Sequence, residues 1–352
     1  MSEAMTLFSQ ALEQLRLAAV NVPGLTELAQ FPFLFRPLVM VVLLGVVAGV
    51  IGVIVNLRSA EFSAEAMVHA VFPGIVAGAV YWGIDAIIPA ASVVAVAAAL
   101  VLTIVSHRSR RGEASEAGTA VVLTSFFSIG LILSLAKGDM SGQLEALMFG
   151  RLLEVTDARL AQALIVCAVA LLLIAATWKE QVAYAFDRTG ARASGLRILA
   201  LDLVLNTAIA AAVVSASTAV GILLVIGYLV IPGATARVLA SRVRTMVVVA
   251  IAVGVGGGYL GMLLMVLPET LDKPISPQAT VALVMTGILL LAVGVSTARE
   301  RLDRIRHRDH STQPVTVAAA STTADTEATT DRAGGAEDSA SGVTPVAERS
   351  RV

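Results

Sequence analysis

Long apolar runs without a charged residue dominate this chain and recur along it. The run from Leu38 to Leu57 alone holds twenty residues. A helix needs about 20 apolar residues to cross the hydrocarbon core of a bilayer, and continuous rather than alternating runs favour helices over barrel strands. The pattern therefore predicts about nine membrane-spanning helices, at residues 38–57, 63–82, 86–105, 117–136, 159–178, 198–215, 219–237, 246–267 and 278–298.

The predicted fold class is all-α, a polytopic helical membrane protein with its transmembrane domain at residues 31–298. Residues 1–30 lack the apolar core of a signal peptide, and we expect them to form an N-terminal segment outside the cytoplasm, because the number of predicted spans is odd. Within this segment, the pattern of residues 5–20 predicts a weakly amphipathic helix that lies on the outer membrane surface. Residues 299–352 begin with a basic juxtamembrane segment and continue as an acidic tail rich in Ser, Thr and Ala. We expect this tail to be disordered, because it cannot bury enough apolar surface to fold.

Composition and charge support a membrane protein and predict its orientation. Charged residues are 14% of the chain and hydrophobic residues 57%, whereas a soluble domain carries about 25% charge. Lys and Arg gather in every second connection, which the positive-inside rule assigns to the cytoplasm. These connections contain Arg58 and residues 107–111, 179–197, 237–244 and 299–308. We therefore predict a multi-pass protein of the plasma (cytoplasmic) membrane with a cytoplasmic C-terminus.

The second predicted span carries the ionisable residues of greatest interest. Glu61, Glu65 and His69 follow one another at a spacing of four, which places them near one stripe of a helix. Carboxylate and imidazole groups together suit Zn²⁺, Mn²⁺ or Fe²⁺, and ionisable groups at membrane depth usually face a cavity or a partner. Glu65 and His69 are the predicted metal contacts, while Glu61 lies nearer the membrane edge. The alternative is an interhelical hydrogen bond made by His69.

Two further acidic residues are weaker candidates for metal contacts. Glu116 opens the fourth predicted span, where a carboxylate also complements the helix dipole. Asp202 lies one turn into the sixth span, four residues before Asn206. This pair either lines a pathway or makes hydrogen bonds between helices.

Proline and glycine interrupt two predicted spans, at Pro73-Gly74 and Pro232-Gly233. Such breaks mark binding regions in many transporters, although both residues are common in membrane helices. They are predicted pathway or helix-break positions. The glycine-rich run Gly254–Gly261 predicts close helix packing.

Motifs of ATP hydrolysis and proteolysis are missing from the sequence. It has neither a Gly-x-x-x-x-Gly-Lys-Ser/Thr loop nor a His-Glu-x-x-His motif. We therefore expect that the chain is not an enzyme, that any ATPase is a separate subunit, and that no nucleic acid is a partner.

Five short motifs lie in order along the predicted membrane domain. They are Phe31-Pro-Phe-Leu-Phe-Arg-Pro37, Ala64-Glu-Ala-Met-Val-His-Ala-Val-Phe-Pro-Gly74, Leu147-Met-Phe-Gly-Arg-Leu-Leu153, Phe186-Asp-Arg-Thr-Gly-Ala-Arg-Ala-Ser-Gly195 and Leu229-Val-Ile-Pro-Gly-Ala-Thr-Ala-Arg237. Together they resemble the permease subunits of zinc, manganese and iron ABC importers, the type-3 metal permeases.

The resemblance implies an ABC importer permease architecture and a set of partners. These are a second copy of the chain, a cytoplasmic ABC ATPase dimer and an extracytoplasmic metal-binding protein, with the translocation path between the two copies. Glu65 and His69 fall on the family's metal-contact positions, with Glu65 replacing the usual Asp. The segment that couples to the ATPase would include Asp187, Ala191 and Gly195, and Arg151 stands where the family often has a small polar or acidic residue.

The function that the resemblance implies is import of a divalent transition metal ion by alternating access at a homodimer interface. No cofactor would be bound permanently, since the metal is the cargo. The sequence leaves open whether that metal is zinc, manganese or iron. Two alternatives remain: an ABC permease for a metal chelate such as haem, a siderophore or cobalamin, and a secondary transporter that needs no ATPase.

Overall fold

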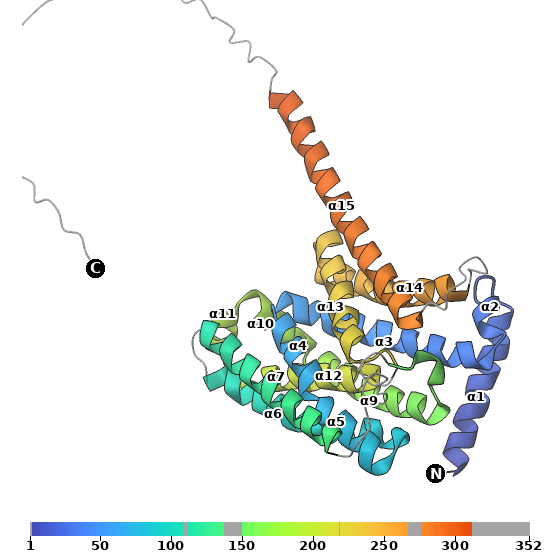
Figure 1. Ribbon diagram of the computed structural model, residues 1–352. Coiled ribbons are helices and arrows are strands. Elements are labelled where there is room, and N and C mark those ends of the chain that lie inside the picture. Colours follow the sequence, from blue (N-terminus) through green and yellow to red (C-terminus); the bar gives the residue numbers. More distant parts are fainter. Residues whose placement is uncertain (1, 109–111, 137–149, 218, 267–275, 312–352) are drawn as a thin grey trace, which may run out of the picture. The chain divides into compact units, whose positions relative to one another are not determined.

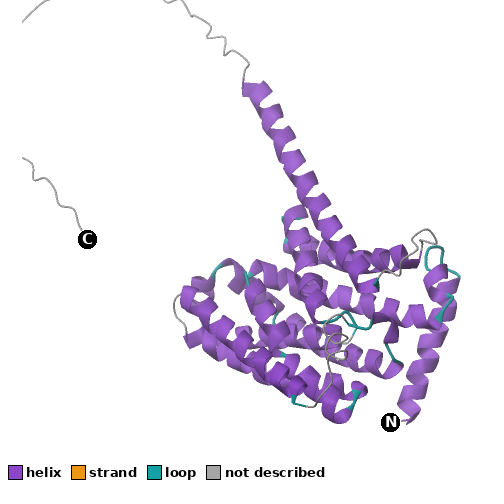
Figure 2. Ribbon diagram, viewed as in Figure 1, coloured by secondary structure: helices purple, strands orange, loops and turns teal. Residues whose placement is uncertain are grey.

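The computed structural model describes residues 2–108, 112–136, 150–217, 219–266 and 276–311. All regular elements among these residues are helices (Figure 2), which confirms the predicted all-α class. The chain divides into a helical body, Met1–Asp303, and a C-terminal unit, Arg304–Val352. Of the second unit the structure describes only the end of the last helix, so the predicted disorder of the tail lies outside the described residues.

Figure 1 shows the order of the helices along the chain. Their bounds are α1 (Ser2–Val20), α2 (Thr26–Ala29), α3 (Pro32–Leu57), α4 (Glu61–Ala70), α5 (Phe72–Ala77), η1 (Gly78–Trp82), η2 (Ile84–Ala86), α6 (Ile87–Arg108), α7 (Gly112–Leu135), η3 (Leu152–Glu154), α9 (Asp157–Ala176), α10 (Trp178–Phe186), α11 (Arg188–Ala193), α12 (Ile198–Ser217), α13 (Ile222–Leu239), α14 (Val243–Val266) and α15 (Pro277–Ser311).

Eight helical segments of the described residues are long and apolar enough to cross a membrane. Each of these eight segments overlaps a different predicted span. The one predicted span without such a segment is 219–237. That range corresponds to α13, whose apolar stretch Leu224–Leu239 is shorter, so the ninth crossing stays a prediction. The division between the sixth and seventh spans falls between Ser217 and Ile222, where Gly221 adopts a φ of 84°.

The second predicted span is a broken helix rather than a continuous one. Helix α4 ends at Ala70, Val71 forms a turn, and α5 and the π-helix η1 continue as far as Trp82. Pro73 explains the break, because it has no backbone N–H to donate to the carbonyl of His69, four residues earlier. Instead, Pro73 lies in the first turn of α5, where a missing N–H costs nothing.

Helix α3 lies at the centre of the body and packs on α13 and α14. Small residues permit these crossings. A Cβ on Gly52 would collide with the carbonyl oxygen of Leu229 in α13, and one on Gly49 would lie 2.8 Å from the Cα of Ile251 in α14. Helix α12 packs on α6 and α9, while α4 and α5 pack on α6 and α7. The main hydrophobic core thus forms from apolar helices that approach closely at glycine residues.

Polar contacts tie different elements to the two ends of α3. Near its start, Arg36 pairs with Asp157 of α9, and Asp157 also accepts a hydrogen bond from Ser9 of α1 at 2.9 Å. After its end, Arg58 contacts α10 and α12. The two arginines are 22 residues apart, or about 33 Å along a helix. Helix α1 and the segment α10–α11 therefore lie at opposite ends of the bundle, as Figure 1 also shows.

Candidate metal site and coupling segment

The candidate metal site lies on α4, which returns into the bundle after the end of α3. Glu61, Glu65 and His69 are all partly exposed, whereas Ala64, Ala66, Met67, Val68 and Ala70 are buried. The stripe predicted from the spacing of four is therefore the open side of this helix. His69 stands eight residues after the start of α4, or about 12 Å along its axis.

The imidazole of His69 packs between helices without a hydrogen bond at Nδ1. Its ring lies edge-on to Phe127 of α7, with centroids 5.4 Å apart, and Phe127 stacks on Phe72 at 5.1 Å. Nδ1 is buried and has no hydrogen-bond partner among the described residues. Buried polar atoms are normally paired. The alternative role of His69 was an interhelical hydrogen bond, and Nδ1 makes none with the described residues. Its lone pair could therefore bind a ligand.

The helix break adds a second feature that favours a cation. His69 lies in the last turn of α4, where the partial negative charge of the helix dipole is concentrated. Pro73 removes the usual donor to its carbonyl. Ends of interrupted helices coordinate cations in many transporters. The geometry of α4 thus suits a positive ion beside Glu65 and His69.

One copy of the chain offers an incomplete set of metal ligands. The part of the chain that the structure describes contains no group of three or more His, Cys, Asp or Glu side chains able to hold a metal ion. Zinc usually takes four ligands, and Mn²⁺ takes six in octahedral sites. Glu65 and His69 would therefore need further ligands from water or from another chain.

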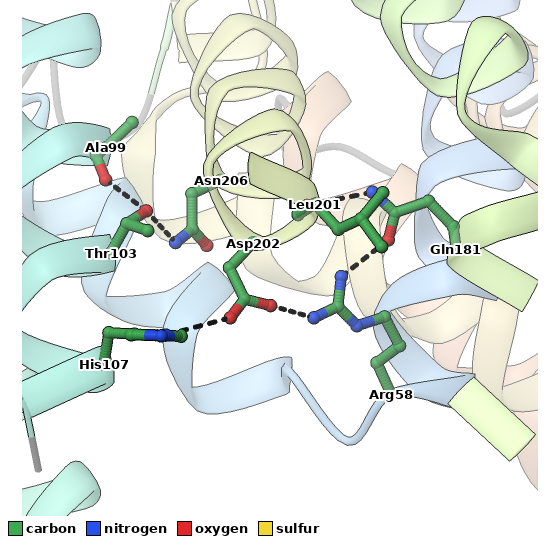
Figure 3. A network of polar contacts seen from close by, with 8 residues as sticks. All are labelled: Arg58, Ala99, Thr103, His107, Gln181, Leu201, Asp202 and Asn206. Carbon is green, nitrogen blue, oxygen red and sulfur yellow. Dashed lines mark hydrogen bonds and ion pairs between the residues drawn. The ribbon is translucent and has the colours of Figure 1, made fainter. Parts of the chain in front are cut away.

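The two weaker acidic candidates lie in different surroundings. Glu116 is exposed, and it stands in the second turn of α7, which begins at Gly112. Asp202 forms an ion pair with Arg58, and its Oδ2 lies 3.9 Å from Nδ1 of His107 (Figure 3). Asn206 donates a hydrogen bond to Thr103 at 2.9 Å. Asp202 and Asn206 thus join helices of the bundle through side-chain contacts.

Both Pro-Gly pairs lie where helices cross closely. A Cβ on Gly74 would be 2.8 Å from the Cα of Ala91 in α6, and one on Gly233 would be 2.5 Å from Nδ2 of Asn56 in α3. Nδ2 of Asn56 donates to the Gly52 carbonyl at 2.9 Å and to the Val230 carbonyl at 3.3 Å. The two glycines therefore have a packing role, whatever their part in a pathway.

The segment predicted to contact an ATPase is a short helix with a defined cap at each end. Asp187 is the N-cap of α11 and accepts hydrogen bonds from the backbone N–H groups of Thr189 and Gly190 at 3.0 and 2.8 Å. Gly195 has a φ of 80°, and the bonds from Gly195 N–H to the Arg192 carbonyl and from Leu196 N–H to the Ala191 carbonyl complete a Schellman motif.

Contacts within the chain explain the residue type at each motif position of this segment. Ala191 is buried against Tyr184, Ile198 and Leu201 of the same chain, whereas a Cβ on Gly195 would meet nothing within 4 Å. Gly195 is thus required by its backbone angle. Asp187 itself is exposed, so the outer face of the segment is open to a partner.

Arg151 and Gly150 belong to the third motif, whose residues 147–149 lie outside the described part. Arg151 is exposed and pairs with Glu154 at 2.9 Å. Gly150 has a φ of 80° and lies directly against the backbone of Gly221. Gln278 of α15 donates to the Gly150 carbonyl at 3.0 Å.

Sequence reasoning missed the residues around Arg58. It used Arg58 only as a signal of orientation and gave no role to Gln181 or Tyr184, although all three meet beside Asp202. An arginine that follows an apolar run is usually a charge at the membrane surface. The side chain of Arg58 is only 8% exposed, and the hydropathy of the preceding run could not predict this burial.

Comparisons with known proteins bear on the site. The sequence model of the ABC 3 transport family matches residues 30–296. The manganese transport system membrane protein MntC of Listeria monocytogenes is 34% identical over 239 residues, which cover 68% of this chain and 83% of the relative. The chelated iron transport system membrane protein YfeC of Yersinia pestis is 31% identical over 232 residues, or 65% of this chain and 77% of that one.

A solved structure shares the fold. PsaBC from Streptococcus pneumoniae, determined in complex with Fab, matches with a TM-score of 0.65 and 25% identity. The match covers 76% of this chain and 94% of that chain. Helices α1 and α2 precede the residues that the family model matches.

Proposed function

Because this chain belongs to the ABC 3 transport family, we propose that it is the permease subunit of an importer that carries a divalent transition metal ion into the cytoplasm. The family match confirms the resemblance based on the five motifs. The names of the relatives, which specify manganese and chelated iron transport, support manganese or iron as the cargo. Zinc stays a candidate cargo only because carboxylate and imidazole ligands also suit Zn²⁺.

The observation that carries this proposal is the open stripe of α4. Glu65 and His69 stand together on a broken helix, and Nδ1 of His69 is buried without a partner among the described residues. An ionisable pair at membrane depth needs a compensating partner, and a divalent ion supplies one. Such a site binds the ion transiently, because a tightly bound ion would not be released.

A second copy of the chain would complete the ligand set. Two copies related by a twofold axis would bring two carboxylates and two imidazoles to one ion, which fills the four positions that Zn²⁺ takes and supplies four of the ligands for Mn²⁺ or Fe²⁺. Alternating access at this homodimer interface would then expose the ion first outside and later inside. The extracytoplasmic metal-binding protein would deliver the ion.

ATP hydrolysis falls to a separate subunit in this proposal. The exposed segment from Asp187 to Gly195 would dock on the ATPase dimer, on the side that the positive-inside rule assigns to the cytoplasm. Its capped helix offers a rigid surface for that contact. The C-terminal end of α15 would lie on the same side of the membrane.

The experiment that tests the function is uptake by the reconstituted complex. The permease, the ATPase and the binding protein are assembled in vesicles and offered Mn²⁺, Fe²⁺ and Zn²⁺ in turn. We expect ATP-dependent accumulation of at least one of these ions. Flux driven by an ion gradient without any ATPase would instead establish a secondary transporter.

Import of chelated iron is the second candidate, favoured by the name of the Yersinia pestis relative. The same vesicles distinguish it when iron is offered as the free ion or as a chelate. Uptake of the intact chelate, with no uptake of free ions, would replace the first proposal.

A further inference from the structure

A buried arginine joins the predicted coupling segment to the helix that carries the candidate metal pair. Arg58 is the C-cap of α3, and its side chain is only 8% exposed. It forms an ion pair with Asp202 of α12 and donates a hydrogen bond of 2.6 Å to Oε1 of Gln181 in α10. Figure 3 shows this guanidinium between the two partners.

Helix α10 holds the same arginine through an aromatic ring. The Cζ of Arg58 lies 4.2 Å from the centroid of Tyr184, a cation–π contact. Arg188, the first residue of α11, approaches the same ring at 5.4 Å. Burial raises the pKa of Tyr184, which keeps the phenol neutral. The end of α10 and the start of α11 therefore contact one guanidinium.

The turn that contains Arg58 leads directly into α4. Ser59 has a φ of 50°, and the bonds from Ser59 N–H to the Asn56 carbonyl and from Ala60 N–H to the Val55 carbonyl close a Schellman turn. Helix α4 begins at the next residue, Glu61. Such a short, hydrogen-bonded turn allows little movement of Arg58 relative to α4. A displacement of Arg58 is thus passed on to α4, which carries Glu65 and His69.

Space beside the network allows such a displacement. A cavity of about 350 Å³ is lined by Arg58, Ser63 of α4, Tyr184 of α10, Arg188 of α11 and Asp202, among others. By contrast, Gln181 is fully buried and donates to the Leu201 carbonyl at 2.9 Å. Gln181 fixes α10 to α12, while Arg58 contacts both helices at the wall of the cavity.

We propose that Arg58 is the positioning residue that transmits movement of the segment α10–α11 to α4, and thereby couples ATP hydrolysis to movement of the metal ion. This inference rests on the proposed function. Arg58 does not contact the metal in this arrangement. Its loss should leave binding of the ion intact and uncouple transport from hydrolysis.

The test measures transported ions per hydrolysed ATP in vesicles that contain the complete transporter, with Mn²⁺ and Zn²⁺ as probes. Arg58→Met should lower this ratio at least tenfold, while the affinity for the ion changes less than twofold. Arg58→Lys, which can retain the pair with Asp202, should recover part of the ratio. The matched control is Arg36→Met, which removes the other arginine of α3 that forms an ion pair and should leave the ratio unchanged.

Several outcomes would overturn the inference. An unchanged ratio in Arg58→Met would do so, as would an equal fall in Arg36→Met, because that fall would indicate general destabilisation. If Arg58→Met does not fold, Tyr184→Leu keeps the ion pair and should lower the ratio at least threefold; an unchanged ratio there rejects the proposal. Failure of the wild-type complex to move any of Mn²⁺, Fe²⁺ and Zn²⁺ would instead reject the proposed function.

Discussion

Gly45 of α3 and Gly254 of α14 meet backbone to backbone. A Cβ on Gly45 would lie 2.7 Å from the carbonyl carbon of Gly254, and a Cβ on Gly254 would lie 2.7 Å from the carbonyl oxygen of Gly45. Neither position has room for a methyl group without a shift of the opposing backbone. The glycine-rich run in α14 thus serves the close packing that the sequence predicts.

Adding a methyl group at this crossing should destabilise the protein. We expect Gly254→Ala to lower the free energy of unfolding by about 1–3 kcal/mol, the usual cost of overpacking. The control is Gly256→Ala, because a Cβ there would meet nothing within 4 Å. Thermal unfolding of both variants in detergent micelles checks the difference. Equal midpoints would contradict the crossing.

Removing the candidate metal pair should stop transport without unfolding the protein. Glu65→Gln with His69→Ala is expected to reduce ATP-dependent uptake of Mn²⁺ at least tenfold, because the site loses both its charge and its imidazole lone pair. Glu61→Gln should stay within twofold of the wild type, since Glu61 is the first residue of α4 and stands eight residues before His69. Glu65→Asp, which keeps the carboxylate, should retain uptake. Normal uptake by the double variant would reject the site.

Neutralising Asp157 should loosen helix α1. Asp157 accepts hydrogen bonds from Arg36, with its Oδ1 2.5 Å from Nε, and from Ser9 at 2.9 Å. Both partners of the ion pair are partly exposed, so we expect Asp157→Asn to cost about 1 kcal/mol. Faster hydrogen exchange confined to α1 would reveal the change. Glu154→Gln removes a more exposed pair and should leave exchange in α1 as it was.

The hydroxyl of Tyr228 should contribute measurably to stability. It lies 3.1 Å from the carbonyl oxygens of Val41 and Gly254, and the residue is 2% exposed. We expect Tyr228→Phe to lower the free energy of unfolding by about 1 kcal/mol. Tyr259→Phe removes a hydroxyl that bonds to the Gly24 carbonyl at an exposed position and should cost less. A larger loss in Tyr259→Phe would contradict this ranking.

Much of the architecture was predictable because its signals are local. Hydropathy places the spans, since each helix must satisfy its own backbone in lipid whatever its neighbours are. The stripe of Glu61, Glu65 and His69 follows from the helical period alone. The caps of α11 likewise depend on neighbouring residues, with Asp187 at one end and Gly195 at the other.

The tertiary structure decided which polar residues meet. Arg58 and Asp202 are 144 residues apart, and no periodicity of the sequence relates them. Only the packing of α3, α10 and α12 buries Arg58 and brings it into contact with its partners. The same holds for Gly45 and Gly254, whose lack of side chains matters because two backbones converge there. Sequence determined the helices and the stripe of α4, since those depend on contacts within one segment. The contacts that connect segments depend on how the helices cross, and that was settled only by folding.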